Sequence, residues 1–177
     1  GVTGRFLYHE AALPSLDLID AGQPEHVGYN PALSGLNLNF NRVNFEWKRA
    51  PDGYAVQMDA RGERFVPLVG MATVEVVARE APLFTFEKGP GRERWTVARA
   101  ALGKGGNRWL PVRHPGLYAA EVFRTLARAQ GIELPAPQAA AALPQGTTLV
   151  EHLSDDLARV LRDMLKFSTN LTAEVVG

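Results

Sequence analysis

The sequence predicts a mixed α and β fold, in which a β-rich region of residues 1–110 is followed by a helical region of residues 111–177. Three observations support this prediction. Short alternating runs with frequent turn signals fill the first region, as in a set of strands. Apolar residues spaced three and four apart dominate the second, as on one face of a helix. The composition, with 46% hydrophobic and 21% charged residues in 177, is typical of a globular chain that buries a sizeable core.

Residues 36–47 alternate in apolar character but change phase once. Leu38 and Phe40 share one parity, whereas Val43 and Phe45 share the other. A one-residue change of phase indicates a β-bulge or a bend that moves the strand from one packing surface to another. The intervening asparagines lie on the opposite face, where we expect solvent-facing or edge positions; they are Asn37, Asn39, Asn41 and Asn44.

Turn signals divide the rest of the β-rich region into short strands. Ala50-Pro51-Asp52-Gly53 joins two alternating runs, because proline presets φ and glycine accepts a positive φ. Residues 42–60 are therefore predicted to form a hairpin. Further strand-like runs follow at residues 74–77, 84–86 and 95–97, with a glycine-proline turn at residues 88–91 between the last two.

Helical spacing begins after Pro111. Pro115 suits the first position of a helix and Gly131 suits the position just past its end. The residues between them predict an amphipathic helix of about four turns, with one apolar face formed by Ala119, Val122, Phe123 and Leu126. Residues 135–146 are rich in proline and alanine, and we expect them to be a surface connection.

A second helix is predicted to end at Phe167 and a third to start near Leu171. Ser154 stands where the second helix should have its N-cap, and its apolar stripe consists of Leu157, Val160, Leu161, Met164 and Leu165. Ser168 and Asn170 would then lie at a corner between the two helices, from which a hydroxyl and a carboxamide can point into one cleft. In the alternative interpretation, Ser168 only caps the last helix.

The surroundings of this Ser-x-Asn triplet resemble a known enzyme family. Residues 153–157, 164–166 and 168–174 are similar to the S-x-N region of the penicillin-binding D-alanyl-D-alanine carboxypeptidases, in the penicillin-binding protein 4-like class with inserted domains. Further stretches resemble the same family in the same order, so that the resemblance spans nearly the whole chain; they are residues 2–4, 32–43 and 111–132.

The resemblance implies a fold, a function and two site residues. Residues 1–110 would be an inserted region, and the helices would belong to a serine β-lactamase/transpeptidase-like catalytic domain. The activity would be that of a periplasmic or otherwise extracytoplasmic serine-type carboxypeptidase or endopeptidase, acting on peptidoglycan peptides that end in D-Ala-D-Ala. The full-length parent would bind β-lactams. Ser168 would relay a proton toward the leaving D-alanine, and the Asn170 amide would hold the substrate backbone.

Two motifs that such enzymes need are absent from the 177 residues. S-x-x-K supplies the acylated serine with its lysine base, and K-T-G lies on a strand. No serine of the chain has a lysine three residues later; the serines are Ser15, Ser34, Ser154 and Ser168. The chain therefore looks like a middle fragment, which we expect not to turn over substrate by itself. Residues 153–177 would then either self-associate or be held loosely.

Other classes of function lack a signal. Nineteen basic and nineteen acidic residues balance, which argues against nucleic acid as a partner. The locally basic segment 88–113 is expected to form a solvated face, with contact to an anionic polymer as the alternative. No cysteine is present, the four histidines lack ligand spacing and are expected at the surface, and no nucleotide motif occurs. We therefore expect no metal and no cofactor.

A second function stays open beside the enzyme. The chain would then be a non-catalytic cell-wall-binding or protein-interaction module that keeps one motif as a relic. The parent open reading frame distinguishes the two hypotheses. An upstream S-x-x-K and a downstream K-T-G would favour the enzyme, and their absence would favour the module.

Overall fold

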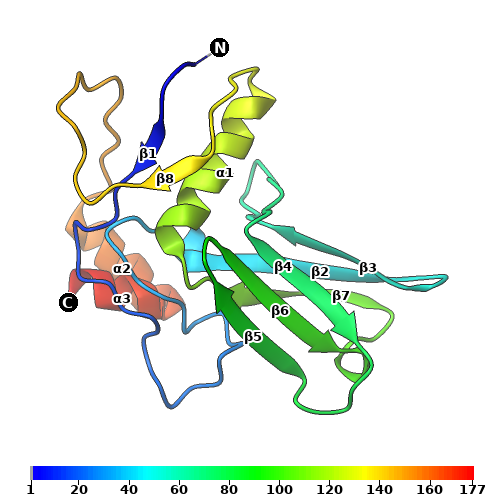
Figure 1. Ribbon diagram of the computed structural model, residues 1–177. Helices are drawn as coiled ribbons and strands as arrows, with labels where there is room; N and C mark the ends of the chain where they lie inside the picture. The colour runs from blue at the N-terminus through cyan, green and yellow to red at the C-terminus, as the bar shows by residue number, and fades with distance from the viewer. Residues whose placement is uncertain (1) are drawn as a thin grey trace.

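The computed structural model describes residues 2–177 and confirms the predicted mixture of helices and sheets (Figure 1). Three sheets are formed, with the strand orders β3-β2-β7, β4-β6-β5 and β1-β8. The strands are β1 (Phe6–Tyr8), β2 (Arg42–Ala50), β3 (Gly53–Asp59), β4 (Ala72–Val77), β5 (Phe84–Gly89), β6 (Arg92–Ala98), β7 (Gly105–Pro111) and β8 (Pro137–Ala139). The helices are α1 (Pro115–Ala129), α2 (Leu157–Phe167) and α3 (Asn170–Val176), with 3-10 turns η1 (Asn39–Asn41) and η2 (Arg99–Ala101).

The first sheet contains the predicted hairpin of residues 42–60. β2 and β3 pair antiparallel, and Ala50 faces Gly53 across the proline-containing turn. On its other edge β2 pairs antiparallel with β7, so that Val43 lies opposite Leu110. β2 is thus the central strand, and its apolar residues face the core.

The second sheet is built on β6. β5 and β6 form an antiparallel hairpin around the turn at residues 88–91, as the sequence predicts. β4 pairs with the other edge of β6 in parallel orientation, with Val74 opposite Trp95. A parallel pair requires a long connection. The chain from residue 78 to residue 91, which includes β5, provides it.

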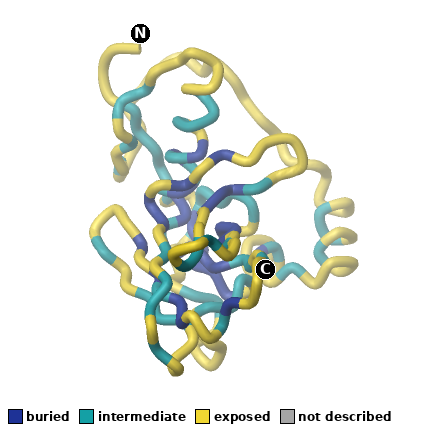
Figure 2. Tube along the Cα trace, turned by 90° about the vertical axis from the view of Figure 1, so that its right-hand side faces the viewer, coloured by how far each residue is buried: buried dark blue, intermediate teal, exposed yellow. Residues whose placement is uncertain are grey.

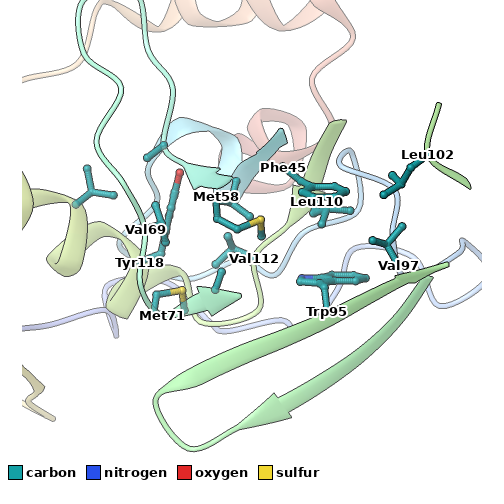
Figure 3. Packing of buried hydrophobic residues seen from close by; sticks show 14 residues of the cluster. Phe45, Met58, Val69, Met71, Trp95, Val97, Leu102, Leu110, Val112 and Tyr118 are labelled. Carbon is teal, nitrogen blue, oxygen red and sulfur yellow. The ribbon is translucent and has the colours of Figure 1, made fainter. Parts of the chain in front are cut away.

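The hydrophobic core lies between these two sheets and is closed by α1. Figure 3 shows Trp95 of β6 facing Phe45 and Leu110 of the first sheet. Tyr118 brings α1 into the same cluster, and its hydroxyl donates a hydrogen bond of 2.8 Å to the backbone carbonyl of Arg42. Burial raises the pKa of Tyr118. Core residues come from both sides of the predicted division at residues 110 and 111, and that division stays a prediction.

Helix α1 begins and ends where the sequence predicts. Pro115 is its first residue, and Gly131 follows its end with a φ of 76°. The predicted apolar face is only partly buried, because Phe123 is 60% exposed and packs at a tilt against Phe6 instead of entering the core. Residues 135–146 are more than a connection. They contain β8, which pairs in parallel with β1 beside α1 (Figure 1).

The expectation that the four asparagines face solvent is wrong for two of them. Asn41 and Asn44 are fully buried, and Asn37 and Asn39 are half-buried. The Asn41 amide donates to the carbonyl of Ala32 at 2.9 Å. Asn41 thus satisfies a backbone carbonyl that water cannot reach, and the Asn44 amide donates to the buried carboxylate of Asp59 at 3.4 Å.

Most cations of the basic segment 88–113 are exposed, as expected for a solvated face, but some have partners or are buried. Lys88 pairs with Asp17 at 2.6 Å, and Arg94 pairs with Glu87 at 2.8 Å. Arg113 is buried. Arg92, Arg99 and Lys104 are exposed and form no ion pair among residues 2–177, so contact with an anionic polymer stays a prediction.

Three of the four histidines are half-buried, and the surface expectation is wrong for them. His9 contacts the carbonyl of Ala140 at 3.0 Å, and His26 stacks on Phe84. His114 lies 3.1 Å from the buried carboxylate of Glu93. Only His152 is fully exposed. The histidines therefore serve separate local contacts, and within residues 2–177 no cluster of three potential metal ligands is found.

The C-terminal helices lie at the side of the molecule, beside the loop that follows β1 (Figure 1). α2 has no buried residue, and only Leu171 of α3 is buried. In Figure 2 the buried residues gather in the middle of the molecule, whereas the C-terminal segment is mostly exposed. Across residues 2–177, none of the helices is both long and apolar enough to span a bilayer.

Candidate functional site

The predicted corner between the last two helices is present. α2 ends at Phe167, and Ser168 adopts the left-handed conformation with a φ of 51°. The chain turns there because the backbone N–H groups of Ser168 and Thr169 both bond to the carbonyl of Met164. α3 then begins at Asn170. A residue with a side chain rarely takes this conformation without a structural or functional reason.

The start of α2 differs from the prediction. Asp156, and not Ser154, is the N-cap residue, and its carboxylate accepts a hydrogen bond of 2.9 Å from the N–H of Arg159. Arg159 also pairs with Asp155 at 3.4 Å. Aspartate and serine cap helices about equally well, so that the sequence alone does not separate neighbouring candidates.

The structure assigns Ser168 no role as a side-chain cap. Thr169 occupies the N-cap position of α3, and Ser168 ends α2 through its backbone. Among the hydrogen bonds of residues 2–177, none involves the Ser168 hydroxyl, which lies at an exposed position. The hydroxyl is therefore free to contact a ligand.

Ser168 and Asn170 open onto one pocket of about 320 Å³. Three segments of the chain that are distant in sequence form its walls. They are the end of the loop before β2, the turn η1 with the first residue of β2, and the helix corner; the lining residues are Gly28, Tyr29, Pro31, Phe40, Arg42, Phe167, Ser168, Thr169, Asn170 and Leu171.

The first wall is a loop, residues 17–30, held by buried polar side chains. The guanidinium of Arg113 donates to the backbone carbonyls of Asp17, Glu25 and Asn30, at 3.0 Å for Glu25. The Asn30 side chain in turn accepts hydrogen bonds from two backbone N–H groups of the same loop. These contacts fix an otherwise irregular segment beside the pocket.

The loop contacts the helix corner directly. The Asn170 amide donates a hydrogen bond of 3.2 Å to the carbonyl of Tyr29. One position earlier, Gly28 lies so close to β7 that an added Cβ would be 2.8 Å from the carbonyl oxygen of Trp109. Only glycine fits there. One N–H of the Asn170 amide is engaged, so its second N–H and its carbonyl oxygen are available to a ligand.

The second wall is the turn η1. Asn39, Phe40 and Asn41 all have positive φ values, between 49° and 57°. Such a run is costly for residues other than glycine. The Asn41 side chain holds it, since its amide donates to the carbonyl of Ala32 and its oxygen accepts from the N–H of Leu38 at 3.0 Å. As a result Phe40, 42% exposed, turns toward the pocket instead of the core.

Arg42 supplies the cation of the pocket. Its guanidinium lies 4.9 Å from the ring centroid of Phe40 and 4.8 Å from that of Trp109. Burial lowers the pKa of Arg42, although an arginine keeps its charge at any physiological pH. The pocket thus combines a hydroxyl, a carboxamide and a positive charge.

Sequence reasoning named two residues of this pocket and missed three others. Ser168 and Asn170 are brought together by the corner, and their catalytic roles stay predictions. Tyr29 and Arg42 were not singled out, and Phe40 was interpreted only as an apolar residue of the alternating run. The available signal was the change of phase in residues 36–47, which arises from the turn η1. Of the two predicted alternatives, the bend is present and the β-bulge is not.

Comparisons with known proteins identify the family of the chain. The sequence model of the D-Ala-D-Ala carboxypeptidase 3 (S13) family matches residues 20–177. The chain belongs to this family. A search of the curated proteins gives no match.

Among the solved structures, the chain is similar to penicillin binding protein 4 from Haemophilus influenzae, which was crystallised in complex with a β-lactam. The TM-score is 0.54 at 22% sequence identity. The match covers 78% of this chain and 33% of that protein, so the chain spans about a third of its length. At this identity the likeness concerns the fold.

Proposed function

We propose that this chain is the S-x-N-bearing part of a serine-type D-Ala-D-Ala carboxypeptidase or endopeptidase that acts on peptidoglycan peptides. The observation that carries the proposal is the opening of Ser168 and Asn170 onto one pocket in a chain of the S13 family. Because S-x-x-K and K-T-G are absent from the 177 residues, the chain by itself is inactive in this proposal. Residues 1–110 are the inserted region, and the helices belong to the catalytic domain.

The proposed reaction is acyl transfer to a serine of the longer protein. The serine of its S-x-x-K motif attacks the carbonyl between the two D-alanines while the lysine takes the serine proton. The C–N bond then breaks, and the leaving D-alanine amine needs a proton. The Ser168 hydroxyl relays that proton, and the Asn170 amide hydrogen-bonds the substrate backbone. Water finally hydrolyses the acyl-enzyme.

The proposal includes the ligands and location of the longer protein. It binds β-lactams, a proposal supported by the β-lactam complex of the similar Haemophilus influenzae protein. Peptidoglycan lies outside the cytoplasm, so we place the longer protein in the periplasm or another extracytoplasmic space. For the isolated chain we propose self-association through residues 153–177, because several large apolar side chains of this segment are exposed.

Labelled penicillin tests the assignment of the nucleophile. We expect the 177-residue chain to form no covalent adduct, because acylation requires the S-x-x-K serine. Intact-protein mass spectrometry measures this directly. A longer protein that carries this chain behind an S-x-x-K segment is the positive control. A stoichiometric adduct mapped to Ser15, Ser34, Ser154 or Ser168 would contradict the proposal and make that residue the nucleophile.

Ser168→Ala in the longer protein tests the proton relay. We expect the turnover of a D-Ala-D-Ala peptide to fall by about a hundredfold or more. The free energy of unfolding should change by less than about 1 kcal/mol, because the exposed hydroxyl makes no hydrogen bond within residues 2–177. Ser154→Ala, also at an exposed position, is the matched control and should leave turnover unchanged. Equal effects of the two variants would argue against a catalytic Ser168.

A further inference from the structure

Glu93 of β6 places a fully buried carboxylate against the segment that joins β7 to α1. Its Oε1 atom accepts hydrogen bonds of 2.7 Å from the backbone N–H groups of Arg113 and His114, and the Nδ1 atom of His114 lies 3.1 Å from the same oxygen. The Oε2 atom is also buried and has no hydrogen-bond partner among residues 2–177. A buried carboxylate with one unsatisfied oxygen costs stability relative to an apolar side chain of similar size. Packing therefore does not explain this residue.

The Glu93 carboxylate holds the backbone from which the Arg113 side chain leaves. The guanidinium of Arg113 donates to carbonyls of Asp17, Glu25 and Asn30 in the loop of residues 17–30. This loop contains neither a helix nor a strand, so no ladder of backbone hydrogen bonds fixes its place. Arg113 is buried and supplies that fixation instead.

The loop passes its position on to Asn170 at the helix corner. Arg113 holds the carbonyl of Asn30, and the next carbonyl back along the chain, that of Tyr29, accepts the Asn170 amide at 3.2 Å. Among residues 2–177 the Asn170 side chain has no other hydrogen bond. The terminal torsion of an asparagine side chain has no sharp preference of its own. The direction of this carboxamide thus depends on where the Tyr29 carbonyl lies.

We propose that Glu93 and Arg113 are positioning residues that set the orientation of the Asn170 amide. The path runs from the Glu93 carboxylate to the Arg113 backbone, from the guanidinium to the loop, and from the Tyr29 carbonyl to Asn170. This inference rests on the proposed function, under which that amide holds the substrate backbone. The second sheet then controls a group of the helix corner, although α2 buries none of its residues.

NMR of the Asn170 side-chain amide in the 177-residue chain tests this path without a measurement of activity. Asn170→Asp lacks the two amide protons and so assigns their signals. Glu93→Leu removes the acceptor and Arg113→Met removes the donors, while both keep a side chain of similar length. We expect both variants to shift the Asn170 signals. Exchange of these protons with water should quicken by about threefold to tenfold, as for the loss of one hydrogen bond.

Conservative variants and matched controls separate positioning from a general loss of stability. Glu93→Gln keeps an acceptor for the two backbone N–H groups and should stay close to the wild type. Arg113→Lys keeps the charge with a less extended set of donors and should lie between the wild type and Arg113→Met. Glu75→Leu and Arg92→Met make the same changes at exposed positions, and the Asn170 signals should not respond to them.

Turnover by the longer protein shows whether Arg113 acts through Asn170. Arg113→Met should lower kcat/KM for a D-Ala-D-Ala peptide by about tenfold or more, because the amide is misplaced. In the Asn170→Ala background the same substitution should have little further effect, since the group that it positions is already gone. Effects that multiply in the double variant would contradict positioning through Asn170.

The two measurements fail separately. Asn170 signals that stay unchanged in Glu93→Leu and Arg113→Met would overturn the inference, whatever the turnover. If neither of these variants folds, Arg113→Lys decides, and signals equal to those of the wild type would overturn it. Signals that respond as expected, together with an Asn170→Ala variant of full turnover, would support the path from Glu93 to Asn170 and contradict the proposed catalytic role of Asn170.

Discussion

Two regions of the molecule use their apolar faces differently. One is the sandwich, which is formed by strands β2 to β7 with α1, and the other is the helix pair α2 and α3. Both arise from clear amphipathic patterns in the sequence. In the sandwich, Phe45, Trp95 and Leu110 are completely buried, whereas in α2 Leu157 and Leu165 are 61% and 75% exposed. An apolar pattern therefore identifies the face of an element that needs a partner, but it does not tell whether the same chain supplies that partner.

The difference also divides the candidate site. Two of its walls are held by hydrogen bonds to the segment that joins β7 to α1: the Val112 N–H donates to the carbonyl of Asn41 in η1, and Arg113 donates to the loop of residues 17–30. The helix corner meets them through the single buried residue of α3, Leu171, and the Asn170 bond to Tyr29. Under the proposed function, the rest of a longer catalytic domain covers the exposed side of α2. The corner would then be positioned from both sides.

The largest expected effect comes from opening the sandwich. Trp95→Ala should lower the free energy of unfolding by about 3–5 kcal/mol, because the removed ring leaves a cavity between the two sheets. Denaturant titration followed by circular dichroism measures it. Phe167→Ala at the exposed end of α2 is the matched aromatic control, with an expected change below about 0.5 kcal/mol. Similar losses in both variants would contradict the division between the two regions.

A smaller effect is expected from the link between the sandwich and the pocket wall. Arg113→Met keeps the buried stem but removes the donors to three loop carbonyls, and should cost about 2 kcal/mol of stability. Hydrogen exchange should quicken within residues 17–30 and stay unchanged in β2. Arg92→Met, at an exposed position, is the control. Unchanged exchange in the loop would show that other contacts hold this wall.

Local signals in the sequence predicted much of the fold. The hairpin turns at residues 50–53 and 88–91, both ends of α1 and the break after Phe167 depend on proline, glycine and spacing within a few residues. The same holds for the corner that carries Ser168 and Asn170. These features need no knowledge of distant segments.

The features that were missed depend on contacts between distant segments. Asn41 looked like a surface residue until the carbonyl of Ala32 gave its amide a buried partner. β8 exists only because β1, more than a hundred residues earlier, pairs with it. Arg42 and Tyr29 belong to the candidate site because the helix corner packs on η1 and on the loop. No spacing rule in a single sequence connects those positions.

The smallest expected effect is at the stripe of α2. Leu165→Ala in a monomeric sample should change the free energy of unfolding by less than about 0.5 kcal/mol, because an exposed leucine loses little burial. Leu110→Ala, the same substitution in the sandwich, should cost about 2–5 kcal/mol. Hydrogen exchange at low and at high protein concentration then measures the protection of the backbone amides of α2. If residues 153–177 self-associate, protection across α2 must rise with concentration and Leu165→Ala must reduce that rise. Strong protection of α2 in a demonstrably monomeric sample would show instead that the chain covers this stripe by itself, and the contrast between the two regions would be wrong.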